Sequence, residues 1–135
     1  MHSGKLPEYA GIMATFHAMC NDEKKLAMTL HYIQDHRIDS GDIIDIIYID
    51  NQHSFFMNLI LLYKKAAVML LNYIKKILSG ENIKSYPQDL SKRSYYTIPS
   101  EQEFSIFYRK YNYITKEDIE YLLRIKHPYR LKLPS

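Results

Sequence analysis

Residues 53–79 limit the possible folds more than any other part of the sequence. Apolar residues recur there with a period of 3.6, which predicts one long amphipathic helix that ends at Gly80. Such a helix spans about 40 Å and must cover its apolar face with a sheet or with other helices. The residues expected to face this core are Phe56, Leu59, Ile60, Tyr63, Ala67, Leu70, Leu71, Ile74 and Ile77, and those expected opposite are Asn58, Lys65, Asn72 and Lys76.

Charged residues interrupt this apolar stretch. Two lysine pairs, at positions 64–65 and 75–76, divide it, whereas a membrane span is expected to contain roughly 18 consecutive uncharged residues. We therefore expect the helix of a soluble protein and no membrane partner. The chain has 135 residues, of which 47% are hydrophobic and 24% charged. That is enough for one hydrophobic core and too little for two ordinary domains.

Two β-strands are predicted before the long helix. Residues 26–33 and 43–49 are apolar runs rich in β-branched and aromatic residues, and a turn of sequence Asp-Ser-Gly-Asp lies between them. Residues 2–11 contain two glycines and a proline, a composition that favours a loop. Residues 12–19 have the apolar spacing of a short helix. This order of elements predicts the α/β class.

The sequence after the long helix is polar and rich in turn residues over positions 81–96. Patterns typical of helix N-caps then begin at Ser100 and at Thr115. The expected elements are a short strand near residues 93–98 and helices at about 101–108 and 116–126. We therefore divide the chain into an α/β part, residues 1–90, and a helical appendage, residues 91–135.

The cysteine and charge content limit the expected cellular location and the expected partners of the protein. The single cysteine, Cys20, excludes an intrachain disulfide, and no charged-then-apolar leader opens the chain, so a cytoplasmic location is expected. The 18 Lys and Arg residues exceed the 15 Asp and Glu residues by three, and they are scattered along the chain. Scattered charge of this kind argues against a nucleic-acid partner.

Several motifs in the first hundred residues occur in an order that a known family shares. The first is His2-Ser3-Gly4-x-Leu6-Pro7-x-Tyr9-x-Gly11, and the second is Ile38-Asp39-Ser40-Gly41-Asp42-Ile43-Ile44. Between them lie a helix-like segment, Met13 to Met19, and a strand-like segment, Thr29 to Ile33; weaker matches follow at Pro87-Gln88 and Ser94-Tyr95-Tyr96-x-x-Pro99. This series resembles the folate-dependent formyltransferases, and most of all those that formylate amino sugars.

The resemblance implies a fold, a donor and site residues. It implies the C-terminal part of a Rossmann-like formyltransferase fold, with 10-formyltetrahydrofolate as the formyl donor. Formyl transfer to an amine needs a base, donors for the developing oxyanion, and a carboxylate that orients the base. His2 would be the base or oxyanion-supporting group, Asp39 would orient it, and His31 would lie behind them. The residues that would line the pterin site are Gln34, Asp35, Ile38 and Ser40.

One departure from the family pattern concerns the start of the chain. The family's asparagine would stand two positions before His2, and only Met1 precedes His2 here. We therefore expect a chain truncated at its N-terminus, which lacks the strands that wall the folate pocket. Whether the isolated chain is active stays open at this point.

Weaker sequence signals bear on which amine accepts the formyl group and on alternative functions. The Leu-Pro-x-Tyr-x-Gly and Tyr-Tyr-x-x-Pro segments resemble members that act on a nucleotide-linked amino sugar for polysaccharide synthesis. One alternative is a methionyl-tRNA or other formyltransferase. Another is a non-catalytic binding or pairing module, because basic residues alternate with tyrosines over positions 92–130 and a strand edge would be left open. The open strand edge could also pair with a second copy of the chain, which would give a homo-oligomer.

Simpler explanations exist for each candidate residue taken alone. An Asp before Ser-Gly commonly forms a turn, and a histidine beside the N-terminus is commonly without a role. The other histidines are His17, His31, His36, His53 and His127. They lack helical metal-ligand spacing with a third ligand, and no cysteine cluster assists them, so no metal site is expected.

Overall fold

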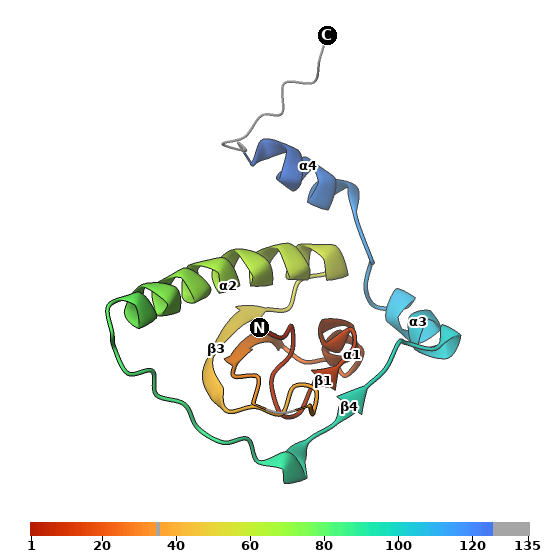
Figure 1. Cartoon of the computed structure of the whole chain (residues 1–135). Coiled ribbons are helices and arrows are strands. Elements are labelled where there is room, and N and C mark those ends of the chain that lie inside the picture. The colour runs from red at the N-terminus through yellow and green to blue at the C-terminus, as the bar shows by residue number, and fades with distance from the viewer. Residues whose placement is uncertain (35, 126–135) are drawn as a thin grey trace.

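An antiparallel hairpin of two strands lies at the centre of the computed structural model, which describes residues 1–34 and 36–125 (Figure 1). Strand β2 (Lys25–His31) pairs with β3 (Ile43–Asp50), with Leu26 opposite Ile49. The register shifts between Leu30 and His31, just before the turn that carries the Asp-Ser-Gly-Asp sequence. Both strands lie close to their predicted positions.

A second, smaller sheet joins the start of the chain to a segment far along it. Strand β1 (Ala10–Gly11) pairs in parallel with β4 (Tyr95–Tyr96), which lies beyond the short 3-10 helix η1 (Leu90–Lys92). Gly11 has φ 95°, and a Cβ there would lie 2.1 Å from the carbonyl oxygen of Tyr96. Only glycine permits this close approach, which explains the last residue of the first motif.

Aromatic side chains connect the helices that surround the hairpin. Phe16, on α1 (Ala14–Cys20), stacks on Phe107 with ring centroids 4.5 Å apart. Phe107 belongs to α3 (Glu101–Tyr108) and is completely buried. Figure 1 shows α3 beside α1, so residues from the predicted appendage contribute to the main core. The division at residue 90 stays a prediction.

All three later helices have side-chain N-caps, two of which, Ser100 and Thr115, were predicted. Ser54 caps α2 (Phe55–Leu78) by accepting the Met57 N–H. Ser100 and Glu103 form a capping box on α3, and Thr115 and Asp118 form one on α4 (Lys116–Arg124). Asp118 is 2% exposed, and it also accepts a hydrogen bond from Ser54 Oγ. One carboxylate therefore ties the starts of α2 and α4 together.

The buried face of α2 differs from the predicted one. The side that packs on the hairpin carries Phe55, Asn58, Leu62, Ala66 and Met69. Residues expected in the core face solvent instead: Tyr63 is 56% exposed, Leu71 57% and Ile77 58%. The error has a physical cause, because α2 has apolar residues on two faces and periodicity alone does not say which face the sheet will cover.

Helix α2 is long and apolar enough, by length and composition, to cross a membrane. The lysine pairs therefore do not exclude a span by themselves. A single such helix is weak evidence, since a core helix of a soluble protein meets the same test. Here Lys65 Nζ donates to the Tyr48 carbonyl at 3.0 Å and Tyr73 Oη donates to Asp45 Oδ2 at 3.0 Å, both on β3.

The burial of Asn58 makes a direct test of which face of α2 is the core face. Its Oδ1 accepts the Gln52 N–H at 2.8 Å, and its Nδ2 donates to Asn51 Oδ1 at 3.0 Å. We expect Asn58→Ala to lower the free energy of unfolding by about 1–3 kcal/mol, because buried polar partners lose their hydrogen bonds. The exposed Leu71→Ala should change it by about 0.5 kcal/mol or less. Urea unfolding of both variants measures these changes in free energy. A larger loss of stability in Leu71→Ala than in Asn58→Ala would mean that the face predicted from the periodicity is the core face.

Candidate active site

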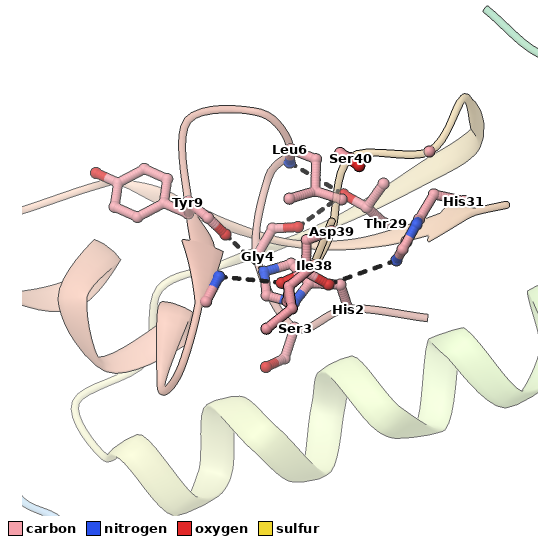
Figure 2. Close-up of polar contacts among 12 residues, drawn as sticks. His2, Ser3, Gly4, Leu6, Tyr9, Thr29, His31, Ile38, Asp39 and Ser40 are labelled. Carbon is pink, nitrogen blue, oxygen red and sulfur yellow. Dashed lines mark hydrogen bonds and ion pairs between the residues drawn. The ribbon is translucent and has the colours of Figure 1, made fainter. Parts of the chain in front are cut away.

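The carboxylate of Asp39 lies between two histidines that come from different parts of the chain (Figure 2). Its Oδ2 is 3.3 Å from Nδ1 of His2, and its Oδ1 is 3.7 Å from Nε2 of His31. Oδ2 also accepts the Gly11 N–H at 3.0 Å. The two motifs, 37 positions apart, therefore meet in space.

The backbone of His2 is held against the outer edge of β2. The His2 N–H donates to the Thr29 carbonyl and the Thr29 N–H donates to the His2 carbonyl, each at 2.9 Å. Thr29 Oγ1 is completely buried; it donates to the Gly4 carbonyl at 2.6 Å and accepts the Leu6 N–H at 3.2 Å. The first motif is therefore folded around one strand residue, which places the His2 side chain inward.

The hydrogen bonds of the His2 ring define which of its nitrogens faces the Asp39 carboxylate. Nε2 lies 2.6 Å from the Tyr9 carbonyl oxygen, and a carbonyl can only accept, so Nε2 carries a proton. Nδ1 then faces Asp39. With an acceptor at each nitrogen, the imidazolium form donates to both. As placed, the ring is a hydrogen-bond donor beside a partly buried carboxylate.

His31 occupies the other side of Asp39 and has a perturbed pKa. Burial lowers the pKa of His31, and the nearby N-terminal amino group lowers it further. The hydrogen bond to the Tyr32 carbonyl and the charge of Asp39 act in the opposite direction. Its place in the structure agrees with the expectation that it would lie behind the two catalytic candidates.

The segment predicted to line a pterin forms the turn around Asp39. The Gln34 side chain closes this turn by accepting the Asp42 N–H at 2.9 Å, and Ser40 Oγ donates to the Arg37 carbonyl at 3.0 Å. Ile38 is 58% exposed beside the carboxylate. Asp35 lies outside the described residues. Binding of a pterin by these residues stays a prediction.

Residues beyond α2 complete the turn, and sequence reasoning gave them little or no weight. Gln88 Nε2 donates to the carbonyls of Asp39 at 3.0 Å and Gly41 at 2.7 Å. Arg93 Nη2 donates to the Ile38 carbonyl at 2.6 Å. The resemblance had marked Gln88 without a role, and no sequence signal pointed to Arg93. A contact across about fifty residues is visible only once the chain is folded.

Within residues 1–34 and 36–125, no group of three or more His, Cys, Asp or Glu side chains is arranged to hold a metal ion. The His2–Asp39–His31 cluster has one carboxylate between two rings, and His2 Nε2 is committed to Tyr9. The cluster is therefore suited to proton and charge chemistry. The expectation of no metal site stays a prediction.

Comparison with known proteins identifies the family, although no family model matches the chain. A methionyl-tRNA formyltransferase of Kosmotoga olearia is 37% identical over 100 residues. A crystal structure of a sugar 3N-formyl transferase, obtained with dTDP and 5-N-formyl-THF, matches with a TM-score of 0.64 at 26% identity. The chain belongs to the formyltransferase family. Its α/β class, matching part of the formyltransferase fold, is confirmed.

The match covers only part of these relatives. The chain aligns over 70% of its own length in both cases, but spans 30% of the Kosmotoga formyltransferase and 35% of the sugar formyltransferase. A Helicobacter canadensis N-formyltransferase, solved with folinic acid and dTDP-3-aminofucose, gives a TM-score of 0.64 with 24% identity; 76% of this chain and 37% of that one are covered. The activity of this formyltransferase chain is therefore a matter for proposal.

The charge of Asp39 predicts a measurable effect on its neighbour. Asp39 favours protonated His31, so Asp39→Asn should lower the pKa of His31 further below its ordinary value of 6.5. NMR titration of the His31 ring protons measures this shift. Asp42→Asn is the matched control, because it removes a carboxylate that is not among the groups acting on the His31 pKa. An equal pKa for His31 in wild type and Asp39→Asn would mean that the carboxylate does not act on this ring.

Proposed function

We propose that this chain carries the catalytic His–Asp pair of an N-formyltransferase, which transfers a formyl group from 10-formyltetrahydrofolate to the amine of a nucleotide-linked amino sugar. The observation that supports this most is the 3.3 Å approach of His2 Nδ1 to the partly buried Asp39 carboxylate. The site would be cytoplasmic, in keeping with the single free cysteine of the chain.

The residues have roles that follow from their contacts. Asp39 would hold the His2 ring oriented and charged, since its Oδ2 also receives the Gly11 N–H and is thereby fixed. His2 would then act as a donor, through the Nε2–H that now donates to the Tyr9 carbonyl, toward the oxygen on which negative charge develops. His31 would buffer the charge of Asp39 from the opposite side.

The turn around Asp39 has features that fit a folate donor. Ile38, next to Asp39, is 58% exposed, and Ile33, at the start of the same turn segment, is 91% exposed, so apolar side chains of the turn are uncovered. A flat heterocycle could cover them, while Gln34 and Ser40 keep the turn closed through their own hydrogen bonds. The bound donor would supply the formyl carbon that the amine nitrogen attacks.

Structural similarity favours the sugar acceptor over tRNA. The sugar 3N-formyl transferase and the Helicobacter canadensis N-formyltransferase solved with dTDP-3-aminofucose have TM-scores of 0.64, against 0.55 at 16% identity for a methionyl-tRNA formyltransferase from Clostridium thermocellum. The second candidate is transfer to methionyl-tRNA, which the 37% identity with the Kosmotoga olearia protein favours.

Binding of folinic acid tests the donor site. Isothermal titration should show saturable binding by the wild-type chain, at least about tenfold weaker in Asp39→Ala because the turn loses a charged hydrogen-bond acceptor. The matched control is Asp50→Ala, which removes a carboxylate at the far end of β3. Absence of binding by a folded wild-type chain would exclude a functional donor site in this chain alone.

Formyl transfer with two acceptors tests the chemistry and the acceptor class. With 10-formyltetrahydrofolate as donor, dTDP-3-aminofucose should be formylated, and His2→Ala should lower the rate by about a hundredfold or more because an oxyanion donor is lost. Methionyl-tRNA should react slowly or not at all. Faster transfer to tRNA, with the steep salt dependence that phosphate contacts produce, would replace the sugar proposal with the tRNA one.

A further inference from the structure

The turn that carries Asp39 is held in an uncommon backbone conformation. Asp39 has φ 55°, in the left-handed region, which residues with a Cβ seldom adopt, although Asp adopts it more readily than most. Backbone strain of this kind persists only where surrounding contacts hold it. The question is therefore which contacts hold this turn.

Close packing on one side of the turn comes from β2. A Cβ at Gly41 would lie 1.8 Å from the Tyr32 carbonyl oxygen, so the turn presses directly on the backbone that leaves the strand. The Tyr32 N–H donates to the Asp42 carbonyl at 2.9 Å, which closes the end of the turn. These contacts anchor its second half but leave the carbonyl of Asp39 to be held from elsewhere.

Gln88 supplies that contact from a segment about fifty residues away. A single Nε2 group donates both of its protons, one to the Asp39 carbonyl at 3.0 Å and one to the Gly41 carbonyl at 2.7 Å. The orientation of the amide is unambiguous, because the flipped amide would place Oε1 against two carbonyl oxygens. The two bonded carbonyls lie on either side of Ser40, so the amide spans the turn.

Two further observations concern the segment that contains Gln88 and Arg93. Gln88 Oε1 is buried and has no hydrogen-bond partner among the described residues, a cost that the two bonds from Nε2 must outweigh. Arg93 Nη2 donates to the Ile38 carbonyl at 2.6 Å, so the carbonyls of positions 38, 39 and 41 are all bonded by side chains of one segment.

The direction of the Asp39 side chain depends on this backbone geometry. The carboxylate reaches the Gly11 N–H at 3.0 Å and His2 Nδ1 at 3.3 Å from a residue whose backbone is in the left-handed conformation. If the turn relaxed to an ordinary conformation, the Cα–Cβ bond would point elsewhere and both contacts would lengthen.

We propose that Gln88 is a positioning residue for Asp39, which it keeps in the left-handed conformation that directs the carboxylate at His2. Its importance for catalysis rests on the proposed function, since the position of Asp39 matters to formyl transfer only if Asp39 orients His2. The positioning itself does not depend on that function, and it can be measured on the chain without any ligand.

The Gly11 amide proton reports on the Asp39 carboxylate directly. In the 135-residue chain, Gln88→Met keeps side-chain length and removes both donors, and Gln88→Glu places a carboxylate against the two carbonyls. We expect the Gly11 proton to move upfield in both variants, toward its position in Asp39→Ala, and its hydrogen exchange to become roughly tenfold faster. Gln52→Met and Gln52→Glu are matched controls, because Gln52 Nε2 donates to one exposed carbonyl, that of Asp50, away from the turn.

The outcomes separate positioning from general damage and from the proposed function. Phe107 lies in the main core, and unchanged exchange at its amide shows that a variant has stayed folded. Should neither Gln88 variant fold, the Gly11 shift in Arg93→Lys, where the guanidinium bond to the same turn is altered, decides instead. A Gly11 proton that stays at its wild-type position in folded Gln88 variants overturns the proposal. If the Gly11 proton shifts in the Gln88 variants but the wild-type chain binds no folinic acid, the positioning role of Gln88 is supported and only the proposed donor site is contradicted.

Discussion

The carboxylate of Asp39 is the point at which the first motif, the end of β2 and the turn after it come together. It receives the Gly11 N–H from β1 and faces His2 at the edge of β2 and His31 at the end of the same strand. Because it is largely buried, each of these groups compensates for the water that the charge has lost. Without this charge, the Gly11 N–H and the two histidine rings would lose their shared partner in the hairpin turn.

The helix α2 illustrates how far a residue pattern determines packing. Leu62 and Ala66 are completely buried against the hairpin, whereas Tyr63 and Leu71 are mainly exposed. Both sets have helical spacing, so the helix itself was predictable and its core face was not. The buried Asn58 is the sharper lesson, since a polar residue became acceptable in the core only because Gln52, Asn51 and Met19 provide partners.

Local chemistry explains why most elements could be predicted. Ser54, Ser100 and Thr115 cap the helices they precede, because a side-chain oxygen satisfies a free N–H whatever the rest of the fold does. The pair His2 and Asp39 came from a resemblance to a family, and the structure brings the two side chains together. Their catalytic roles are still predictions. The participation of Phe107 in the main core could not be predicted, because the position of a residue along the chain does not show which distant aromatic rings it will contact.

The sequence by itself determined the order of the four helices and the two long strands and their approximate ends, because these features depend on neighbours a few positions away, which a linear pattern records. The family resemblance supplied the residues of the two motifs. The tertiary structure alone decided which face of α2 is buried and that Gln88 and Arg93 bond the turn at positions 38–41. The contacts of Gln88 and Arg93 depend on packing between segments about fifty residues apart, where distances of 2.6 to 3.0 Å follow from the folded backbone and not from spacing in the chain.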